Sequence, residues 1–311
     1  MNHLIIGGGG FIGSHLADEL LRAGHSVRIF DRPNLKRYRE FLPDESCEWI
    51  DGDYANQEDL KRVIPGSDVV IHLVSTTLPK SSNDNPIYDV ETNLVGTLRL
   101  LEISRSSGVK KILFISSGGT VYGVPESVPI SESHPTNPIC SYGICKLTIE
   151  KYLRLFNQLH GLDYIVLRLS NPFGERQRIQ SGQGAVAVFL NKAVRGETIE
   201  IWGDGSVIRD YIHISDVIAA MVIAIKYNGT ERILNIGSGQ GVSLNELVSG
   251  IEQVTGYKVN VNYTAKREFD VPISILAIEQ AKKELDWSPK MPLLEGLKQM
   301  AQWLNTFTNI E

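Results

Sequence analysis

A tyrosine and a lysine, Tyr142 and Lys146, lie four residues apart near the start of a segment with helical periodicity. Residues with this spacing share one face of a helix. A free tyrosine has a pKa of about 10, so it can act as a base near neutral pH only if that pKa falls by about three units. A fixed ammonium group beside the phenol favours the phenolate. The pair could therefore be a proton-accepting tyrosine and a lysine that lowers its pKa, but the spacing alone is more typical of an amphipathic helix with a surface lysine.

A glycine-rich turn opens the chain. Gly7, Gly10 and Gly13 form a G-x-x-G-x-x-G pattern between a predicted strand at residues 3–6 and a predicted helix at residues 11–23. Glycines let the backbone approach a pyrophosphate closely, and the start of the helix supplies free N–H groups. The same pattern is also typical of a flexible turn, but its place between a strand and a helix favours dinucleotide binding. In that setting the Tyr/Lys pair is more than a surface lysine on an amphipathic helix.

An aspartate ends the predicted second strand. Asp31 follows Gly13 by 18 residues, where a carboxylate accepts hydrogen bonds from the adenosine ribose and repels a 2′-phosphate. Arg32 could favour NADP, but the strand-end position of Asp31 points at the ribose, so we expect NAD. Asp53 follows the third strand and is either an adenine contact or, equally, a helix N-cap.

Short β-branched runs alternate with helical patterns along the first half of the chain. The predicted strands are residues 3–6, 26–31, 47–51, 68–75, 111–117 and 164–169, and the predicted helices are 11–23, 87–107 and 142–160. This alternation is the signature of βαβ units. It predicts an α/β fold with a Rossmann-type, doubly wound parallel sheet. Long loops at 76–86, 118–141 and 171–184 follow strands of this sheet, where ligands bind.

The elements become shorter after about residue 171. The predicted strands there are residues 198–202, 209–214 and 232–236, and the predicted helices are 216–227, 244–255 and 275–285. No clean linker separates the two halves. We expect a dinucleotide-binding domain at 1–170, to which about 205–240 return, and a smaller interleaved substrate domain made mainly of 171–311.

The bulk composition excludes several classes of protein. The chain has 311 residues, a formal net charge of −5 and mixed charges, with no basic face for nucleic acid. No apolar run approaches the ~20 residues that span a bilayer, and the N-terminus is interpreted as a buried strand, not a signal peptide. The odd cysteine count without a CxxC pair favours a reduced, cytoplasmic setting. We expect no metal, because no metal-ligand spacing joins the cysteines and histidines near the predicted site, which are Cys47, Cys140, Cys145, His72, His134 and His213.

Five motifs lie in a recognisable order. They are GGGGFIGSHL at 7–16, SSGGTVYG at 116–123, SYGICK at 141–146, LRLSNPFG at 167–174 and GDGSVIRDYIHISDV at 203–217. With them the chain resembles the extended short-chain dehydrogenases/reductases, and most of all the UDP-glucose 4-epimerase group. The resemblance implies NAD-dependent 4-epimerisation of a UDP-hexose through a 4-keto sugar, with Tyr142 as the base.

The resemblance also implies site residues. In the family, a Ser or Thr side chain binds the 4-oxygen of the sugar, but alignment on Val121–Gly123 places Gly118 at that position. Ser117 carries the nearest hydroxyl and Thr120 the next, so we assign the role to Ser117. The implied cofactor contacts are Gly7, Gly10, Phe11, Ile12, Gly13, Asp31, Asp53, Tyr54, Lys80, Asn93, Tyr142 and Lys146. The implied substrate contacts are Ser117, Asn171, Arg209, Arg267 and Ser274.

Three of these substrate assignments have a physical reason. Arg209 and Arg267 carry a planar fork that suits phosphate oxygens. Ser274, four positions beyond Asp270, matches a position where a tyrosine would exclude an N-acetyl group. A serine leaves room for one, so UDP-GlcNAc and UDP-GalNAc are further candidate substrates. Alternatively, Ser274 is simply a helix N-cap.

Several alternatives stay open. Dehydratases of the family carry an Asp-Glu pair where this chain has Gly119 and Thr120, which disfavours dehydration. A nucleotide-sugar 4-ketoreductase needs only the tyrosine, the lysine and a hydroxyl. A non-catalytic NAD-binding scaffold has no use for a tuned phenol. The resemblance also implies a homodimer formed by two helices of each chain. Five apolar positions could form that interface or, equally, could face the sheet: Leu94, Leu98, Leu101, Leu147 and Leu155.

Overall fold

The computed structural model describes residues 1–179, 184–266 and 271–308. Arg267 and Asp270 lie outside the described residues. The chain divides into two compact units. Unit 1 comprises Met1–Gly123, Pro135–Arg168 and Ile218–Leu234, and unit 2 comprises Val124–His134, Leu169–Val217 and Asn235–Glu311. The segment that returns to unit 1 is thus shorter than the 205–240 expected from the sequence.

A seven-stranded parallel sheet forms the centre of the fold. Its strands are β1 (Asn2–Ile6), β2 (Ser26–Asp31), β3 (Cys47–Asp51), β4 (Val69–His72), β5 (Lys111–Ser117), β6 (Asp163–Leu169) and β11 (Ile233–Ile236). Their spatial order is β11-β6-β5-β4-β1-β2-β3. This is the Rossmann order with one added strand, and the order reverses between β1 and β4. The predicted α/β fold is confirmed.

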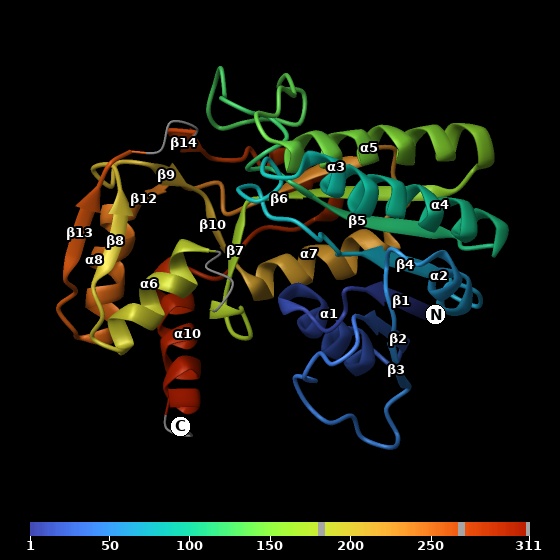
Figure 1. Ribbon diagram of the computed structural model, residues 1–311, viewed down its shortest axis with the longest axis horizontal. Coiled ribbons are helices and arrows are strands. Elements are labelled where there is room, and N and C mark those ends of the chain that lie inside the picture. The colour runs from blue at the N-terminus through green and yellow to red at the C-terminus, as the bar shows by residue number, and fades with distance from the viewer. Residues whose placement is uncertain (180–183, 267–270, 309–311) are drawn as a thin grey trace. The chain divides into compact units, whose positions relative to one another are not determined.

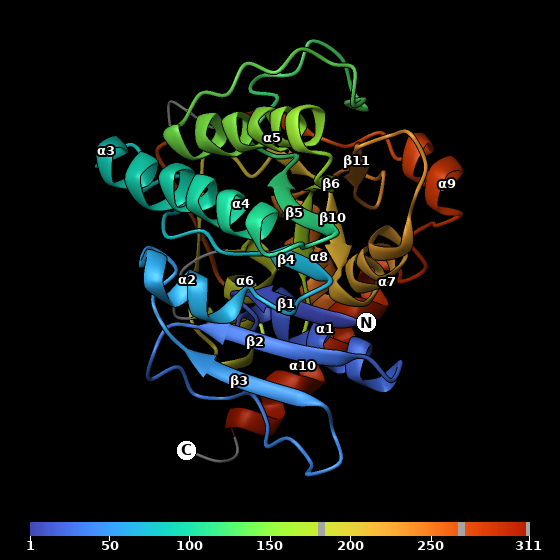
Figure 2. The ribbon, with the colours of Figure 1, turned by 90° about the vertical axis from the view of Figure 1, so that its right-hand side faces the viewer.

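Helices cover both faces of this sheet. They are α1 (Phe11–Arg22), α2 (Gln57–Val63), α3 (Pro86–Asp89), η1 (Val90–Val95), α4 (Gly96–Ser106), α5 (Ser141–His160) and α7 (Ile214–Lys226). Figures 1 and 2 show α4 and α5 on one face and α1 and α7 on the other. Leu4 of β1, Phe114 of β5 and Leu153 of α5 belong to one buried core cluster. Burying each such side chain contributes roughly 1.5–3 kcal/mol, which fixes α5 on the sheet.

The helix predicted at 87–107 contains a wide turn. It runs without a break from Pro86 to Ser106, but Val90–Val95 are wound as a π-helix. Single π-turns inside α-helices are frequently found at functional sites. Asp89 and Asn93, on the inner side of this turn, are buried, whereas Ile87 and Tyr88 are exposed.

The described part of unit 2 combines short strands with helices. The strands are β7 (Asn171–Phe173), β8 (Ile199–Trp202), β9 (Ile208–Arg209), β10 (Tyr211–His213), β12 (Val242–Ser243), β13 (Val261–Thr264) and β14 (Ile273–Ser274). The helices are α6 (Ala185–Val194), α8 (Leu244–Thr255), α9 (Glu279–Leu285) and α10 (Leu293–Thr308). Phe173, Leu190, Leu247 and Met300 share its core. Ser243 and Glu246 form a capping box that starts α8.

One predicted element differs in a way that affects the site. The helix expected from residue 275 begins only at Glu279, and its N-cap is Ile278. Ser274 belongs to β14 and pairs with Arg209 of β9. The interpretation of Ser274 as a helix N-cap is therefore wrong. Among the described residues, no helix combines the length and apolar character needed to cross a membrane.

Candidate active site

Tyr142 and Lys146 occupy the first turns of α5 and face the same way. The ammonium nitrogen of Lys146 lies 5.6 Å from the centre of the Tyr142 ring and 4.7 Å from the centre of the Phe114 ring. It donates a hydrogen bond to the carbonyl oxygen of Ile115 at 3.0 Å. The lysine is thus held between α5 and β5, beside the phenol that the sequence assigns as the base.

The start of α5 is capped by another part of the chain. Its own N-cap residue, Cys140, makes no side-chain cap. Instead, Asn83 Oδ1 accepts the backbone N–H of Ser141 at 2.9 Å, and Ser82 Oγ accepts that of Tyr142 at 3.1 Å. Both donors are N–H groups that the helix itself leaves unsatisfied. The loop at 76–86 therefore positions the helix turn that carries the base.

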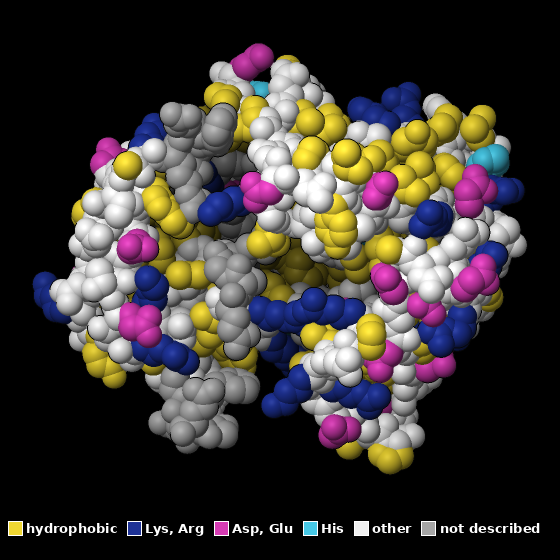
Figure 3. Space-filling view, viewed as in Figure 1, with side chains coloured by type: hydrophobic (Ala, Val, Ile, Leu, Met, Phe, Trp, Pro, Cys, Tyr) yellow, Lys and Arg dark blue, Asp and Glu magenta, His cyan; other side chains and the backbone are white. Residues whose placement is uncertain are grey.

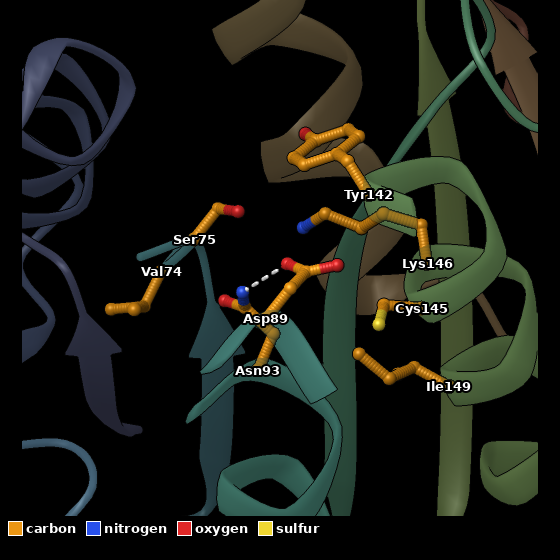
Figure 4. A pocket seen from close by; sticks show the side chains of 8 residues that line it. All are labelled: Val74, Ser75, Asp89, Asn93, Tyr142, Cys145, Lys146 and Ile149. Carbon is orange, nitrogen blue, oxygen red and sulfur yellow. Dashed lines mark hydrogen bonds between the residues drawn. The ribbon is translucent and has the colours of Figure 1, made fainter. Parts of the chain in front are cut away.

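A small cavity lies beside the lysine. Its volume of about 10 Å³ matches one water molecule. The residues that line it are Val74, Ser75, Asp89, Asn93, Tyr142, Cys145, Lys146 and Ile149. Val74 and Ser75 follow β4, Asp89 ends α3, Asn93 lies on η1, and the other four belong to α5. Figure 4 shows Asp89 and Asn93 across from Lys146. Tyr142, Lys146 and Asn93, which the sequence named separately, meet here.

Burial dominates the protonation of both α5 residues. It raises the pKa of Tyr142 above its usual 10, and the charges of Cys140 and Asp89 raise it further. Burial also lowers the pKa of Lys146 to about 8, against the opposing effect of Asp89 and Glu150. The positive charge of Lys146 and that of any bound cation are therefore needed before the phenol can ionise near neutral pH.

A buried ion pair holds this helix against the sheet. Arg168 binds Glu150 through two nitrogens, at 2.6 and 3.0 Å, and both side chains are at most 3% exposed. Ser116 donates to Glu150 at 2.6 Å, and Arg168 donates to the hydroxyl of Tyr122 at 2.9 Å. The pair ties α5 to β5 and β6. Sequence reasoning missed it, although Glu150 continues the four-residue spacing of Tyr142 and Lys146.

The glycine turn has the geometry of a pyrophosphate cradle. Gly7 has φ of +84°, and a Cβ on Gly13 would lie 2.6 Å from the Gly7 carbonyl oxygen. Helix α1 therefore approaches the turn only because both residues are glycines. Its N-cap, Gly10, offers no side-chain cap to the first N–H groups of the helix. These residues fit a bound dinucleotide.

Asp31 lies at the cradle, as expected from its place in the sequence. Its Oδ2 accepts the backbone N–H of Gly9 at 2.9 Å, and Oδ1 accepts that of Arg32 at 2.9 Å. Asp53 Oδ1 accepts the N–H of Ala55, which makes a local turn, and the N-cap of α2 is Asn56. Asp53 is therefore not a helix N-cap.

The other candidate cofactor residues of unit 1 differ in their surroundings. Tyr54 is 6% exposed, and its hydroxyl bonds His72 at 3.0 Å and Thr97 at 2.8 Å. Lys80 is exposed on the 76–86 loop. Asn93 is buried, and its Oδ1 accepts the N–H of Thr76 at 2.9 Å. Of the three, only Asn93 lines the cavity.

The turn after β5 presents two hydroxyl groups. The carbonyl oxygen of Ser117 accepts the N–H of Val121 at 3.2 Å, which closes the turn. Thr120 Oγ1 is buried and has no hydrogen-bond partner within the described chain. The same segment packs against α5, since a Cβ on Gly143 would lie 2.8 Å from the Thr120 carbonyl oxygen. Both hydroxyls therefore remain candidates for the role assigned to Ser117.

Unit 2 brings three of the predicted substrate residues together. Asn171 Nδ2 and the Asn171 N–H both donate to the Asp210 carbonyl oxygen, at 2.9 and 3.0 Å. Arg209 precedes Asp210. Ser274 of β14 is the direct partner of Arg209 in the parallel pair of β9 and β14. Side chains of directly paired residues share one face of a sheet. Arg209 and Ser274 therefore point to the same side.

Asp210 fixes this arrangement and was not singled out in the sequence. It is 0% exposed. Its carboxylate accepts the N–H and the hydroxyl of Ser238, both at 2.7 Å, and the N–H groups of Gly239 and Leu276 at 3.3 Å. Asp210 thereby joins the segments that flank Arg209 and Ser274.

The histidines and cysteines have structural surroundings. His134 Nε2 accepts the N–H of Glu126 at 2.9 Å, and His213 Nδ1 lies 2.8 Å from the hydroxyl of Ser215. Cys47, Cys140 and Cys145 are free thiols. In the described ranges, no group of three or more His, Cys, Asp or Glu could hold a metal ion.

Comparison with known proteins shows which proteins the chain is similar to. The model of the NAD dependent epimerase/dehydratase family matches residues 3–237. The UDP-glucose 4-epimerase of Mycolicibacterium smegmatis is 34% identical over 308 residues, which cover 97% of this chain and 98% of that protein. The dTDP-4-dehydro-6-deoxyglucose reductase of Escherichia coli is 35% identical over 306 residues, 96% and 95% of the two chains.

Two solved structures are also similar over nearly their whole length. UDP-glucose 4-epimerase from Thermotoga maritima, solved with UDP-glucose, has a TM-score of 0.94 at 36% identity and covers 99% of this chain and 100% of that one. UDP-N-acetylglucosamine 4-epimerase from Methanobrevibacter ruminantium, solved with UDP-N-acetylmuramic acid, has a TM-score of 0.91 at 28% identity and covers 98% of both chains.

Proposed function

The chain belongs to the NAD dependent epimerase/dehydratase family, and from this we propose that it is an NAD-dependent 4-epimerase of UDP-hexoses, with UDP-glucose and UDP-galactose as substrates. The observation that carries the proposal is the Tyr142/Lys146 pair, held on α5 of the unit that also carries the glycine cradle and Asp31. A relative at 34% identity is a UDP-glucose 4-epimerase, which supports the choice of sugar.

The residues of the chain divide the work as follows. The phenolate of Tyr142 accepts the proton of the sugar 4-hydroxyl and returns it to the 4-oxygen in the second half of the reaction. Bound NAD supplies the hydride acceptor and donor at carbon 4. The ammonium of Lys146 stabilises the phenolate. A positioned base of this kind contributes about 10²–10⁴-fold to the rate.

The proposed cofactor-binding residues belong to unit 1, and the proposed diphosphate-binding residues belong to unit 2. Gly7, Gly10 and Gly13 hold the pyrophosphate of the cofactor, and Asp31 holds its adenosine ribose. Asn171 and Arg209 hold the diphosphate of the sugar nucleotide. The diphosphate anchor lets the sugar present either face of carbon 4 while the rest of the substrate stays bound. With NAD bound, such an arrangement would allow the configuration at that carbon to be inverted.

Incubation of the purified protein with each UDP-sugar tests the proposal. We expect UDP-glucose and UDP-galactose to interconvert to one equilibrium mixture from either side, with no net change in NADH. Chromatography of the released sugars measures the conversion, and absorbance at 340 nm measures net NADH. Absence of interconversion would contradict the proposal.

A nucleotide-sugar 4-ketoreductase is the second candidate. It is supported by the 35% identical E. coli protein named dTDP-4-dehydro-6-deoxyglucose reductase. This reaction uses the same tyrosine and lysine but consumes one reduced cofactor per turnover. Stoichiometric oxidation of NADH with a 4-keto sugar nucleotide, without interconversion of UDP-glucose and UDP-galactose, would favour it over the epimerase.

The proposed substrate range includes N-acetylated sugars. Ser274 is 5% exposed and lies on the same side of its sheet as Arg209. A small side chain there leaves space near the sugar nucleotide. A structural relative at 28% identity is a UDP-N-acetylglucosamine 4-epimerase, which supports the extension to UDP-GlcNAc and UDP-GalNAc.

The proposed assembly is a homodimer formed by the outer face of α3, η1, α4 and α5. Apolar side chains gather over α5 in Figure 3, and the exposed ones on these elements are Ile87, Tyr88, Val90, Ile144, Leu155 and Leu159. Of the leucines that could form this interface or face the sheet, Leu101 is 0% exposed in the core of unit 1, and Leu94 and Leu98 are partly buried against that core. Light scattering at micromolar concentration measures the mass, and a monomer would contradict the dimer.

The proposed location is the cytoplasm. Its support is chemical: three thiols, none paired in a disulfide, suit a reducing compartment. Fractionation of cells that produce the protein from its own gene tests this.

A further inference from the structure

Asp89 is a buried carboxylate to which the proposed mechanism gives no role. It is 0% exposed. Its Oδ1 accepts hydrogen bonds from the Thr77 hydroxyl and from Asn93 Nδ2, the latter at 2.8 Å, and its Oδ2 accepts one from the Ser141 hydroxyl at 2.6 Å. Burial raises the pKa of this carboxyl, but hydrogen bonds from Ser141, Thr77 and Cys145 outweigh it, and the net pKa lies below its usual value. Asp89 is therefore a buried negative charge.

A buried charge requires an opposite charge nearby, because burial of an isolated ion is very costly. Asp89 lines the cavity of about 10 Å³. Lys146 is the cation among the eight described residues that line it. Figure 4 shows the carboxylate of Asp89 and the amine of Lys146 pointing toward one another. The cavity is small enough to keep the two charges in each other's field without bulk water between them.

The other ionisable groups that face Lys146 are accounted for. Glu150, on α5, also raises the pKa of Lys146, but less than Asp89 does, and both its carboxylate oxygens are bound by Arg168, at 2.6 Å and 3.0 Å. His72, on β4, is neutral because burial lowers its pKa to about 3. Burial raises the pKa of the Cys145 thiol to about 12, so this neighbour is also uncharged. Tyr142 is a further neighbour. The charge of Asp89 itself raises the pKa of this phenol, so a favourable effect of Asp89 on its ionisation has to come through Lys146.

We propose that Asp89 is a positioning residue for the reaction: it is the counter-ion of Lys146, and it acts on Tyr142 through that lysine. The same carboxylate also binds Ser141, the residue before Tyr142, so it fixes both the charge and the place of the pair. The first part of this inference, that Asp89 is the counter-ion of Lys146, does not depend on any substrate or activity. The kinetic half rests on the proposed epimerase function.

The sign of the effect follows from the charges. Burial lowers the pKa of Lys146 to about 8, and Asp89 is the first of the groups that raise it. Replacement of Asp89 by Asn removes that support, so the pKa of Lys146 falls further, by ~1–3 units. A neutral lysine then predominates near pH 7. The Asn side chain keeps the shape of Asp, and the hydroxyls of Thr77 and Ser141 can rotate, so the variant is expected to fold.

The decisive experiment titrates Lys146 itself in the full-length protein without substrate. Lysine labelled with ¹³C at Cε is followed by NMR from pH 5 to pH 11, and Lys146→Arg assigns the signal. We expect the Lys146 pKa to fall by at least one unit in Asp89→Asn and to return towards wild type in Asp89→Glu, which keeps the charge. Glu91→Gln removes an exposed carboxylate two residues away and is the matched control; it leaves the Lys146 pKa unchanged.

Two results would overturn the proposal. One is a Lys146 pKa in Asp89→Asn within 0.3 unit of wild type, and the other is an equal fall in Asp89→Asn and Asp89→Glu, which would mean that shape and not charge is decisive. If far-UV circular dichroism shows Asp89→Asn to be unfolded, Asp89→Ser carries the same loss of charge in a smaller side chain and is judged by the same criterion.

The pH profile of kcat/KM for UDP-galactose tests the kinetic half. The alkaline limb reports loss of the lysine proton, so it moves to lower pH in Asp89→Asn, by the same amount as the NMR titration, and stays in place in Glu91→Gln. A shifted NMR pKa with an unshifted alkaline limb would overturn the action on Tyr142. A protein without epimerase activity would refute the proposed function, whereas the NMR titration would still decide whether Asp89 is the counter-ion.

Discussion

The hydroxyl oxygen of Ser82 accepts the backbone N–H of Tyr142 at 3.1 Å, across 60 residues of sequence. Together with Asn83, which accepts the N–H of Ser141, it caps a helix to which it does not belong. Helix N-termini are usually capped by the residue that precedes them. Here the cap comes from the loop after β4, so the position of the base depends on the order of that loop.

Loss of this cap is expected to weaken both the fold and the reaction. Asn83→Ala removes the acceptor of the Ser141 N–H, which costs about 1 kcal/mol in the free energy of unfolding. Turnover is expected to fall as well, because Tyr142 lies one residue further on. Urea unfolding and steady-state kinetics measure the two effects. Asp84→Ala, at the exposed neighbouring position, is the control, and equal effects of the two variants would contradict the role of the cap.

Replacement of the base itself separates chemistry from cofactor binding. Tyr142→Phe is expected to lower turnover by about 10²–10⁴-fold, the usual contribution of a positioned acid–base group. The NAD content of the purified protein is expected to stay at the wild-type level, because the glycine cradle and Asp31 are untouched. Tyr152→Phe, a tyrosine on the same helix that packs against the core, is the control. Turnover of Tyr142→Phe within threefold of wild type would reject the assignment.

Cofactor preference tests the carboxylate at the end of β2. The wild-type protein is expected to bind NAD more tightly than NADP, and Asp31→Ala is expected to narrow the ratio of the two dissociation constants by ~10-fold or more, because hydrogen bonds to a charged group are lost. Fluorescence titration with each cofactor gives both constants. Equal affinities in the wild type would show that Arg32, and not Asp31, decides the choice.

The sugar pocket is tested at Ser274. Ser274→Tyr is expected to lower kcat/KM for UDP-GalNAc by ~10-fold or more, because overpacking typically costs ~1–3 kcal/mol, and to change that for UDP-galactose far less. Parallel assays of the two sugars measure the selectivity. Ser274→Ala, which keeps the space, is the control. Since Ser274 is buried beside Arg209, the melting temperature is recorded too, and equal loss of both activities would reject the gate.

Stability in acid reports a buried histidine. Burial lowers the pKa of His72 to about 3, below the value near 6.5 of an unfolded chain. Between these values the unfolded state takes up a proton that the folded state refuses, so the free energy of unfolding falls by about 1.4 kcal/mol per pH unit as pH decreases from 6.5. His3, with a pKa lowered to about 4, adds to this loss.

Urea unfolding at pH 6 and pH 5 measures this slope. In His72→Gln the part contributed by His72 is expected to disappear, which leaves a shallower dependence on pH. His160→Gln, at the exposed end of α5, serves as the control and keeps the wild-type slope. A His72→Gln protein with the same slope as the wild type would show that His72 is protonated in the folded chain.

The sequence predicted the framework well where the pattern is local. Strands β2, β3 and β5 and helix α8 begin and end where expected, because apolar runs of the right period are flanked by glycine or polar residues. The Tyr142/Lys146 pair and the glycine turn are local for the same reason. Asp31 could be placed because a strand end has a defined position in the Rossmann order.

The rest of the candidate site depends on contacts that no local pattern contains. Asp89 meets Ser141 across 52 residues, and Glu150 meets Arg168 across 18. The π-turn that aims Asp89 inward does not alter the apolar period of its helix enough to be read from the sequence. Ser274 looked like the start of a helix, but pairing with β9 holds it in a strand. Tertiary pairing prevailed over local preference in that case.

The wide turn at Val90–Val95 makes the position of Asp89 sensitive to the length of this helix. A π-turn has the geometry of an α-helix that has absorbed one extra residue. Deletion of a single residue within it would restore a regular helix and swing the preceding segment by about 100° around the axis, the angle that one residue occupies. Asp89 would then leave its place opposite Lys146 although every side chain of the site was still encoded. The orientation of Asp89 therefore depends on the number of residues in this helix more than on the identity of most of them.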